Sequence, residues 1–242
     1  MAIHTADAIV LRRYPFRETS ITLSCLTDRF GKLSGLVKGI RTQPHRYHSA
    51  MEPFTINRIV FYDTRTSSLH LISQCELLAP LEGLQRDLTT TRLAAFCVDL
   101  ADTVVPLEEP QPAVYQLLKH TLERMAATSD ADFQDVRLHF IVRLLRLAGF
   151  QPQVDECTSC GTVVHAAGYW SARQGGLLCQ ACLHEDPKVE PASAELLAAI
   201  EHLAEADQPI VLEPPMRSAL RQRLDEFLHW RLDRLLRSLS PA

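Results

Sequence analysis

Apolar and polar residues along the first 80 positions form short, separated runs that are typical of β-strands. Several runs alternate in polarity or are rich in β-branched residues, and turn-forming residues separate them. We expect strands over 8–11, 21–26, 33–37, 54–62 and 69–75. The segment 39–50 has no period and is expected to be a loop. Five short strands in about 75 residues predict a small barrel of the OB-fold type.

After Pro80 the apolar residues recur every three or four positions, which is the period of an amphipathic helix. We expect helices over 84–104, 114–125, 133–147, 192–206 and 215–239. Gly149 follows the third of them as a C-terminal cap. The predicted fold class is therefore α+β, with an N-terminal five-stranded OB-fold barrel and a C-terminal helical domain.

Four of the seven cysteines form two Cys-x-x-Cys pairs, Cys157 with Cys160 and Cys179 with Cys182. Glycines at 175–176, between the pairs, predict a tight hairpin turn. Two pairs that flank a hairpin can place four thiolates at the corners of a tetrahedron, the geometry that Zn²⁺ favours. Four sulfurs leave no open coordination position, so we expect a structural Zn²⁺ ion in a zinc ribbon.

Two other interpretations of these cysteines stay open. Cys157 and Cys160 could form a redox pair, although such a pair needs a strand-then-helix context and no second pair. His165 or His184 could replace one of the sulfurs as a ligand. The remaining cysteines lie in apolar stretches and are expected to be small core residues: Cys25, Cys75 and Cys97.

The pattern divides the chain into four segments. We expect an OB-fold nucleic-acid-binding domain over 1–80, the first part of the helical domain over 81–151, the zinc-ribbon insertion over 152–187 and the second part of the helical domain over 188–242.

The formal net charge of -4 averages over unlike segments. Residues 1–80 contain ten Lys and Arg against six Asp and Glu, whereas residues 81–156 contain seven against twelve and residues 157–242 eight against eleven. A basic front segment attached to an acidic body indicates an anionic partner for the front segment.

Composition excludes several classes of protein. With 46% apolar and 22% charged residues, the chain is neither collagen-like, nor disordered, nor a disulfide scaffold. No apolar run approaches the roughly 18–20 residues that cross a bilayer, and the start lacks a secretion signal, so we expect a cytoplasmic protein. Because neither a glycine-rich phosphate loop nor Gly-x-Ser-x-Gly occurs, we expect that the protein is not an enzyme.

Basic residues are interleaved with aromatic residues in the predicted loops of the front segment. Single-stranded nucleic acid is bound by cations along its phosphates and by flat rings on which bases stack. The candidate contacts are Arg12, Arg13, Tyr14, Phe16, Arg17, Arg29, Lys32, Lys38, Arg41 and Arg46. An alternative that stays open is that the cations only solvate turns, while Tyr14 and Phe16 cap the barrel core.

Five motifs follow one another in this front segment: 8–13 (AIVLRR), 18–20 (ETS), 27–34 (TDRFGKLS), 37–41 (VKGIR) and 51–54 (MEPF). Their order resembles the N-terminal domain of the RecO family of DNA repair and recombination mediators. The helices, the inserted ribbon and the total length are similar as well, so the resemblance spans essentially the whole chain.

The resemblance implies a function and partners. Members of the family bind single- and double-stranded DNA and anneal complementary strands. Together with RecR they help load the RecA recombinase onto strands coated by single-strand DNA-binding protein, whose acidic, Phe-ended tail they also bind. The expected location is the cytoplasm, in association with the nucleoid.

One departure from the family concerns the long loop. The family usually carries many Lys and Arg there, whereas 39–50 has Arg41 and Arg46 together with His45 and His48. DNA affinity is therefore expected to be lower, or more sensitive to pH, than is usual in the family.

The last predicted helix offers a second candidate surface, for the tail peptide. Its basic residues outnumber its acids, although such a face can also be plain solvated surface. The arginines are Arg217, Arg221, Arg223, Arg231, Arg234 and Arg237. The alternative functions are a protein–protein adaptor with a structural zinc site and no direct DNA binding, or a Cys-x-x-Cys redox protein.

Overall fold

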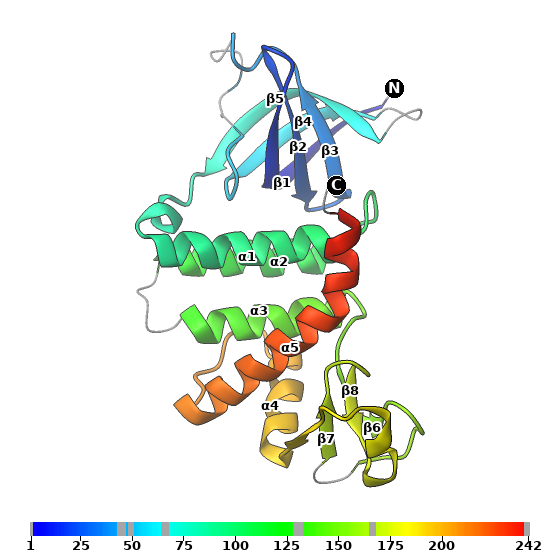
Figure 1. Ribbon diagram of the computed structural model, residues 1–242. Coiled ribbons are helices and arrows are strands. Elements are labelled where there is room, and N and C mark those ends of the chain that lie inside the picture. The colour runs from blue at the N-terminus through cyan, green and yellow to red at the C-terminus, as the bar shows by residue number, and fades with distance from the viewer. Residues whose placement is uncertain are drawn as a thin grey trace. The chain divides into compact units, whose positions relative to one another are not determined.

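The computed structural model describes residues 2–42, 47, 51–63, 68–127, 133–164 and 168–239, with side chains up to residue 231 (Figure 1). The chain forms two compact units, Met1–Phe133 and Gln134–Ala242. The first contains a barrel and two helices, and the second contains three helices and a small sheet. The four segments expected from the sequence stay a prediction, because each unit groups parts of them.

Five strands close the barrel of the first unit. They are β1 (Ile3–Phe16), β2 (Ser20–Thr27), β3 (Gly31–Val37), β4 (Ile56–Tyr62) and β5 (Leu69–Ala79). The order around the barrel is β1-β2-β3-β5-β4, and β4 pairs back with β1. All neighbours are antiparallel except β3 and β5. The predicted five-stranded barrel is confirmed, and it fits an OB-fold.

The first strand is longer than the sequence pattern indicates, because it continues through Pro15 to Phe16. Its residues up to Ile9 pair with β4, whereas beyond Val10 it pairs only with β2. Pro15 therefore lies where one side of the strand has no ladder, and its missing N–H breaks no bond there. A register shift between Val10 and Arg12 accompanies the change of partner.

Side chains that point inward at every second position of the strands fill the barrel. Every second residue of β2 and β3 is fully buried, as the period of a strand requires. The core consists of Ala6, Ala8, Val10, Ile21, Leu23, Cys25, Leu33, Val37, Ile40, Tyr47, Met51, Ile59, Phe61, Ile72 and Cys75. The predicted core positions of Cys25 and Cys75 are confirmed, and the structure also buries Cys97.

Two helices complete the first unit, α1 (Leu88–Val104) and α2 (Pro112–Ala127), which lie side by side (Figure 1). The single helix expected over 84–104 is divided into a 3-10 turn, η2 (Glu82–Gln85), and α1. The cause is Asp87, whose side chain accepts from the Thr90 N–H at 2.8 Å and caps the start of α1.

The second unit contains α3 (Phe133–Leu147), α4 (Ala194–Glu205) and α5 (Pro214–Leu239). Gly149, with φ +74°, ends α3 as predicted. The buried carboxylate of Asp135 accepts from Arg217 Nε at 2.7 Å and Nη2 at 2.8 Å, which ties α3 to α5. His139 of α3 is buried, and its Nε2 lies 2.8 Å from the Ala206 carbonyl oxygen.

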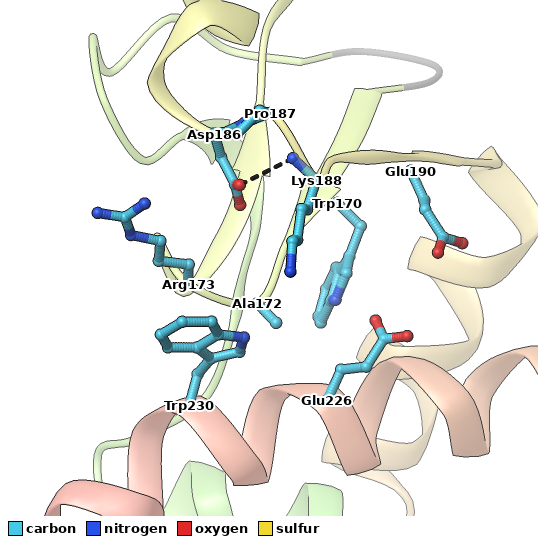
Figure 2. A pocket seen from close by; sticks show the side chains of 9 residues that line it. All are labelled: Trp170, Ala172, Arg173, Asp186, Pro187, Lys188, Glu190, Glu226 and Trp230. Atoms are coloured by element: carbon cyan, nitrogen blue, oxygen red, sulfur yellow. Dashed lines mark hydrogen bonds between the residues drawn. The ribbon is translucent and has the colours of Figure 1, made fainter.

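A four-stranded sheet forms the ribbon of this unit. Its strands are β6 (Gln153–Cys157), β7 (Gly168–Ser171), β8 (Gly176–Leu178) and β9 (Glu190–Ala192), in the order β6-β8-β7-β9, with the 3-10 turn η4 (Gln180–Glu185) after β8. Gly175, with φ +91°, closes the predicted turn between β7 and β8. A pocket lined by residues of the ribbon and α5 opens in this unit (Figure 2).

No helix in the described part of the chain is both long enough and apolar enough to span a membrane.

Candidate nucleic-acid interface and metal centre

Three exposed cations meet at one end of the barrel. Arg17 lies in the turn between β1 and β2, and Lys38 and Arg41 lie in the segment after β3. The backbone N–H of Arg41 donates to the Thr19 carbonyl at 3.1 Å, which holds the two segments together. Within the described residues, none of these three side chains forms an ion pair. Their charge is therefore available to an anionic ligand.

Aromatic rings accompany these cations. The Arg17 guanidinium carbon lies 5.3 Å from the centroid of the half-buried Phe16 ring. Tyr14, two residues earlier on β1 and hence on the same face, is 50% exposed. Arg17 also has a φ of +52°, a left-handed backbone conformation that costs a non-glycine residue about 1–2 kcal/mol. Glu18 is an exposed acid in the same turn.

Two other predicted contacts are engaged by α1. Arg12 forms ion pairs with Asp99 at 3.2 Å and with Asp102 at 2.7 Å. Lys32 pairs with the same Asp102 at 3.5 Å, and the Ser24 hydroxyl donates to it at 3.0 Å. The side chains of Lys32 and Asp102 are largely buried, with 13% and 16% exposed. These cations hold the barrel against α1.

Of the remaining predicted cations, two form ion pairs of their own and one lies outside the described residues. Arg13 pairs with Glu52 at 3.2 Å. Arg29 pairs with Asp28 at 3.4 Å in the turn between β2 and β3. This turn lies at the far end of β2 from Arg17, about 23 Å away at the usual rise of a strand. Arg46 lies outside the described residues.

The ten predicted DNA contacts therefore do not form one surface. It brings together Tyr14, Phe16, Arg17, Lys38 and Arg41, and it separates Arg29 and Lys32 from them. The acid pair at positions 99 and 102 of α1 was missed as a partner of the barrel. Its spacing of three residues, which places both carboxylates on one helix face, is the signal that could have revealed it.

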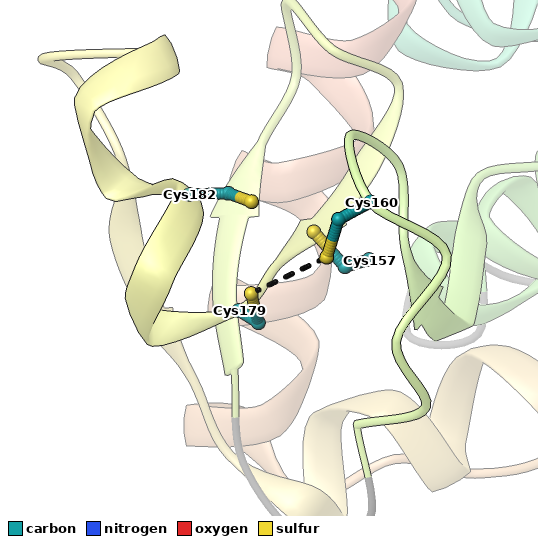
Figure 3. A group of neighbouring side chains, drawn as sticks. All are labelled: Cys157, Cys160, Cys179 and Cys182. Atoms are coloured by element: carbon teal, nitrogen blue, oxygen red, sulfur yellow. Dashed lines mark hydrogen bonds between the residues drawn. The ribbon is translucent and has the colours of Figure 1, made fainter.

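The four predicted metal ligands converge at one point of the ribbon (Figure 3). The sulfurs of Cys157, Cys160, Cys179 and Cys182 all lie within 4.8 Å of one another, and those of Cys160 and Cys179 are 3.7 Å apart. Sulfurs that surround a zinc ion tetrahedrally at about 2.3 Å stand about 3.8 Å from one another. The four cysteines can therefore hold a metal ion.

Backbone turns shape this cluster. The N–H of Gly161 donates to the Cys157 carbonyl at 2.9 Å, and the N–H of Cys182 donates to the Cys179 carbonyl at 3.0 Å. Gly161 has a φ of +72°, which a residue without a Cβ adopts freely. The Sγ of Cys160 lies 3.2 Å from the Thr162 hydroxyl. This hydroxyl was not predicted, although a threonine beside a ligand pair is a visible signal.

The surroundings shift the pKa values of two of these sulfurs in opposite directions. Burial alone would raise the pKa of Cys157, but the backbone N–H groups of Cys179, Cys160 and Ser159 lower it to about 6. The Ser159 hydroxyl favours the thiolate of Cys182, yet burial and the neighbouring sulfurs raise that pKa to about 12. Four thiolates in so small a volume need a positive ion between them.

Of the two histidines considered as alternative ligands, His184 is not part of this cluster. His184 is 77% exposed at its side chain, and its Nδ1 lies 3.1 Å from the Ala181 carbonyl oxygen. His165 lies outside the described residues. Both Cys-x-x-Cys pairs face one another across a ribbon, which differs from the strand-then-helix context of a redox pair.

The arginines of the last helix are partly engaged. Arg217 contacts Asp135, Arg223 pairs with Glu190 at 2.5 Å, and Arg231 donates to the Gln174 carbonyl at 3.2 Å. Arg221 is exposed. The side chains of Arg234 and Arg237 lie outside the described residues, so the predicted tail-binding surface stays a prediction.

Models of a known protein family match nearly the whole chain. The family described as recombination protein O matches with its N-terminal model over residues 1–81 and its C-terminal model over residues 85–240. The protein named DNA repair protein RecO of Desulforudis audaxviator is 31% identical to this chain over 97% of this chain and 83% of its own length. The protein of the same name from Nocardioides is 30% identical over 98% of both chains. That of Bacillus pumilus is 28% identical over 92% of this chain and 86% of its own. The chain therefore belongs to the RecO family and has a role in DNA repair and recombination.

Proposed function

We propose that this chain is a non-enzymatic recombination mediator that binds single- and double-stranded DNA, anneals complementary strands and helps load a recombinase onto protein-coated single strands. The observation that carries the proposal is the cluster of Arg17, Lys38 and Arg41 beside Phe16 and Tyr14, at the end of a closed barrel. The proposed site of action is the cytoplasm, on the nucleoid.

Annealing follows from charge neutralisation. Two DNA strands repel one another through their phosphates, and cations that contact both backbones lower this repulsion without reading sequence. Three cations predict that the logarithm of the affinity for single strands falls with the logarithm of salt concentration at a slope of about -2. The exposed Tyr14 ring adds a stacking surface that any base can use.

The metal is proposed to be a structural Zn²⁺ ion. Cys157, Cys160, Cys179 and Cys182 would hold it, since four sulfurs suit zinc and leave no position for a reacting water. When bound, the ion supplies folding free energy to the ribbon. The chain's own contribution is to fix the four sulfurs through the turn at Gly161 and the N–H groups around Cys157.

The proposal includes the partners that the family resemblance implies. These are RecR, the C-terminal tail of single-strand DNA-binding protein and, indirectly, RecA. Exposed Arg221 and the arginines beyond residue 231 are the candidates for contact with the acidic tail. Titration of that tail peptide into the Arg221→Ala, Arg234→Ala and Arg237→Ala variants tests whether α5 binds the tail. Unchanged affinity in all three variants would exclude α5 as the binding surface.

The central experiment measures binding and annealing of complementary oligonucleotides, with and without a coat of single-strand-binding protein. The triple variant R17Q/K38Q/R41Q should lose about a hundredfold in affinity for single strands at about 0.1 M salt, because three phosphate contacts are lost. Annealing of coated strands should fall with it. Glu18→Gln should strengthen binding, because it removes an acid from the same turn.

A matched control comes from the same barrel. Arg58 on β4 is 50% exposed at its side chain and pairs with Asp7 at 2.9 Å. Arg58→Gln should leave DNA binding unchanged. Equal losses in the control and the triple variant would refute a localised interface. If the wild-type chain binds no DNA even at low salt, the adaptor alternative replaces the proposal.

A further inference from the structure

A pocket of about 430 Å³ lies in the second unit, between the ribbon and α5 (Figure 2). The pair of Arg223 with Glu190 at 2.5 Å and the contact between the rings of Trp170 and Phe227 at 6.1 Å hold its two walls together. The pocket is separate from the cysteine cluster and from the cations of the barrel, and neither the metal site nor the proposed DNA contact uses it.

A buried hydrogen-bond donor lies in the wall of this pocket. The Trp170 side chain is 1% exposed, and no described residue accepts a hydrogen bond from its Nε1. Figure 2 shows this nitrogen close to the Glu226 side chain. Glu226 is already engaged, because Gln222 donates to it at 3.0 Å and Arg223 lies 3.5 Å from its other oxygen. Because this nitrogen is not exposed to the pocket, Trp170 contributes a rigid wall to it and not a hydrogen-bond donor.

A second aromatic ring, from α5, lines the pocket. Trp230 is 51% exposed, which is unusual for the largest apolar side chain. Figure 2 shows its indole across the pocket from Trp170, with the Lys188 ammonium between them. An exposed flat ring in the same lining as a lysine matches a planar ligand that is attached to a phosphate.

The charges of the pocket nearly cancel. The Asp186 carboxylate is occupied, because it accepts from the Ser171 hydroxyl at 2.6 Å and from the Lys188 backbone N–H at 3.0 Å. Glu190 and Glu226 are both within ion-pair distance of Arg223. Lys188 and Arg173 remain as cations in the lining. An uncharged ring that is attached to a phosphate therefore fits better than a free anion.

We propose that this pocket binds a nucleobase of single-stranded DNA. The base stacks on Trp230, and Lys188 lies beside the attached phosphate. The site would give the second unit its own contact with a DNA strand. It goes beyond the proposed function, because binding at the barrel cations does not require it.

Intrinsic fluorescence tests this proposal, because Trp170 and Trp230 are the only two tryptophans of the chain. Deoxyadenosine monophosphate and a five-nucleotide oligodeoxyadenylate should both quench the tryptophan emission of the full chain, since a stacked base quenches indole. An abasic oligonucleotide of equal length and charge should bind the barrel without quenching. Trp230→Ala, followed through Trp170, should weaken binding of the monophosphate about tenfold, whereas Trp230→Phe should retain most of it.

The barrel variant R17Q/K38Q/R41Q separates the two proposals. It should weaken binding of the oligonucleotide and leave quenching by the monophosphate unchanged, so a failure of the barrel interface would not remove the pocket. Three results would overturn the pocket proposal: no quenching by either nucleotide, equal quenching by the abasic strand, or unchanged monophosphate affinity in Trp230→Ala. Quenching only by an acidic peptide with an aromatic end would assign the pocket to a protein partner and overturn it as well.

Discussion

The barrel and the ribbon obtain their stability from different sources. The barrel closes its hydrogen-bond ladder on itself and surrounds a core that contains fifteen of the described residues. In the described part of the ribbon, the buried cluster around the cysteines consists of Cys157, Leu178 and Cys182, so two of its three members are candidate metal ligands. A cluster of this size contributes little stability by itself, and a metal commonly supplies the missing free energy to such a module.

This difference determines where function can be changed without loss of the fold. The cations proposed to contact DNA lie in turns at the end of the barrel, outside its core. In the ribbon, two of the cysteines that could hold a metal ion also belong to the buried cluster of the module. We therefore expect binding variants of the barrel to remain folded and ligand variants of the ribbon to unfold locally.

Metal removal should give the largest effect. Structural zinc sites contribute about 10–16 kcal/mol of binding free energy, so a chelator or Cys179→Ser should unfold the ribbon while the barrel persists. Trp170, buried on β7, should then become exposed to water. The measurement is the Trp170 emission wavelength in a Trp230→Phe background, together with metal content per chain.

The control for this experiment is Cys25→Ala, which removes a buried free thiol from the barrel. It should leave one metal ion bound per chain. A chelated protein with unchanged Trp170 emission would contradict the view that the ribbon depends on its ligand.

A core substitution in the barrel should give the next largest effect. Ile59 on β4 is fully buried, and Ile59→Ala should lower the free energy of unfolding of the first unit by about 2–5 kcal/mol. Metal content should not change. The measurement is denaturant unfolding followed by far-ultraviolet circular dichroism, and a parallel loss of metal would show that the two modules depend on each other.

Alkaline pH should weaken the barrel by a smaller amount. Burial raises the pKa of Cys25 from 9.0 to about 12, so its protonated thiol stabilises the fold fully below about pH 9 and loses this contribution as pH rises toward 12. At about pH 10 the loss is about 1 kcal/mol. Comparison of unfolding free energies of wild type and Cys25→Ala at neutral and alkaline pH isolates it. Identical pH profiles would refute the assignment.

The smallest effect is expected at the contact between the barrel and α1. Arg12 is 38% exposed at its side chain, and such ion pairs contribute about 0–1 kcal/mol. Arg12→Gln should therefore change the unfolding free energy of the first unit by no more than this. It should also leave DNA affinity close to wild type, because Asp99 and Asp102 already engage its charge. If Arg12→Gln weakened DNA binding as much as Arg17→Gln does, Arg12 would have to contact DNA, contrary to this prediction.

Local sequence patterns predicted the strands of the barrel and the helices. Alternation and period located the strands and helices, because burial of one face is written into the spacing of apolar residues. The two Cys-x-x-Cys pairs predicted the cluster correctly, since a short loop confines its two sulfurs. The continuation of β1 through Pro15 was missed, because only the pairing of neighbouring strands shows that this position needs no N–H.

The sequence by itself determined the barrel, the helices and the cluster of four cysteines, because each depends on residues that are close in the chain or on a repeated period. The tertiary structure decided which cations are available. Arg12 and Lys32 are neutralised by acids seventy or more positions away, whereas Arg17 and Arg41 are brought together by the barrel. It also decided that Trp170 and Trp230 line one pocket, because charge pairing and cavities depend on distances in space and not along the chain.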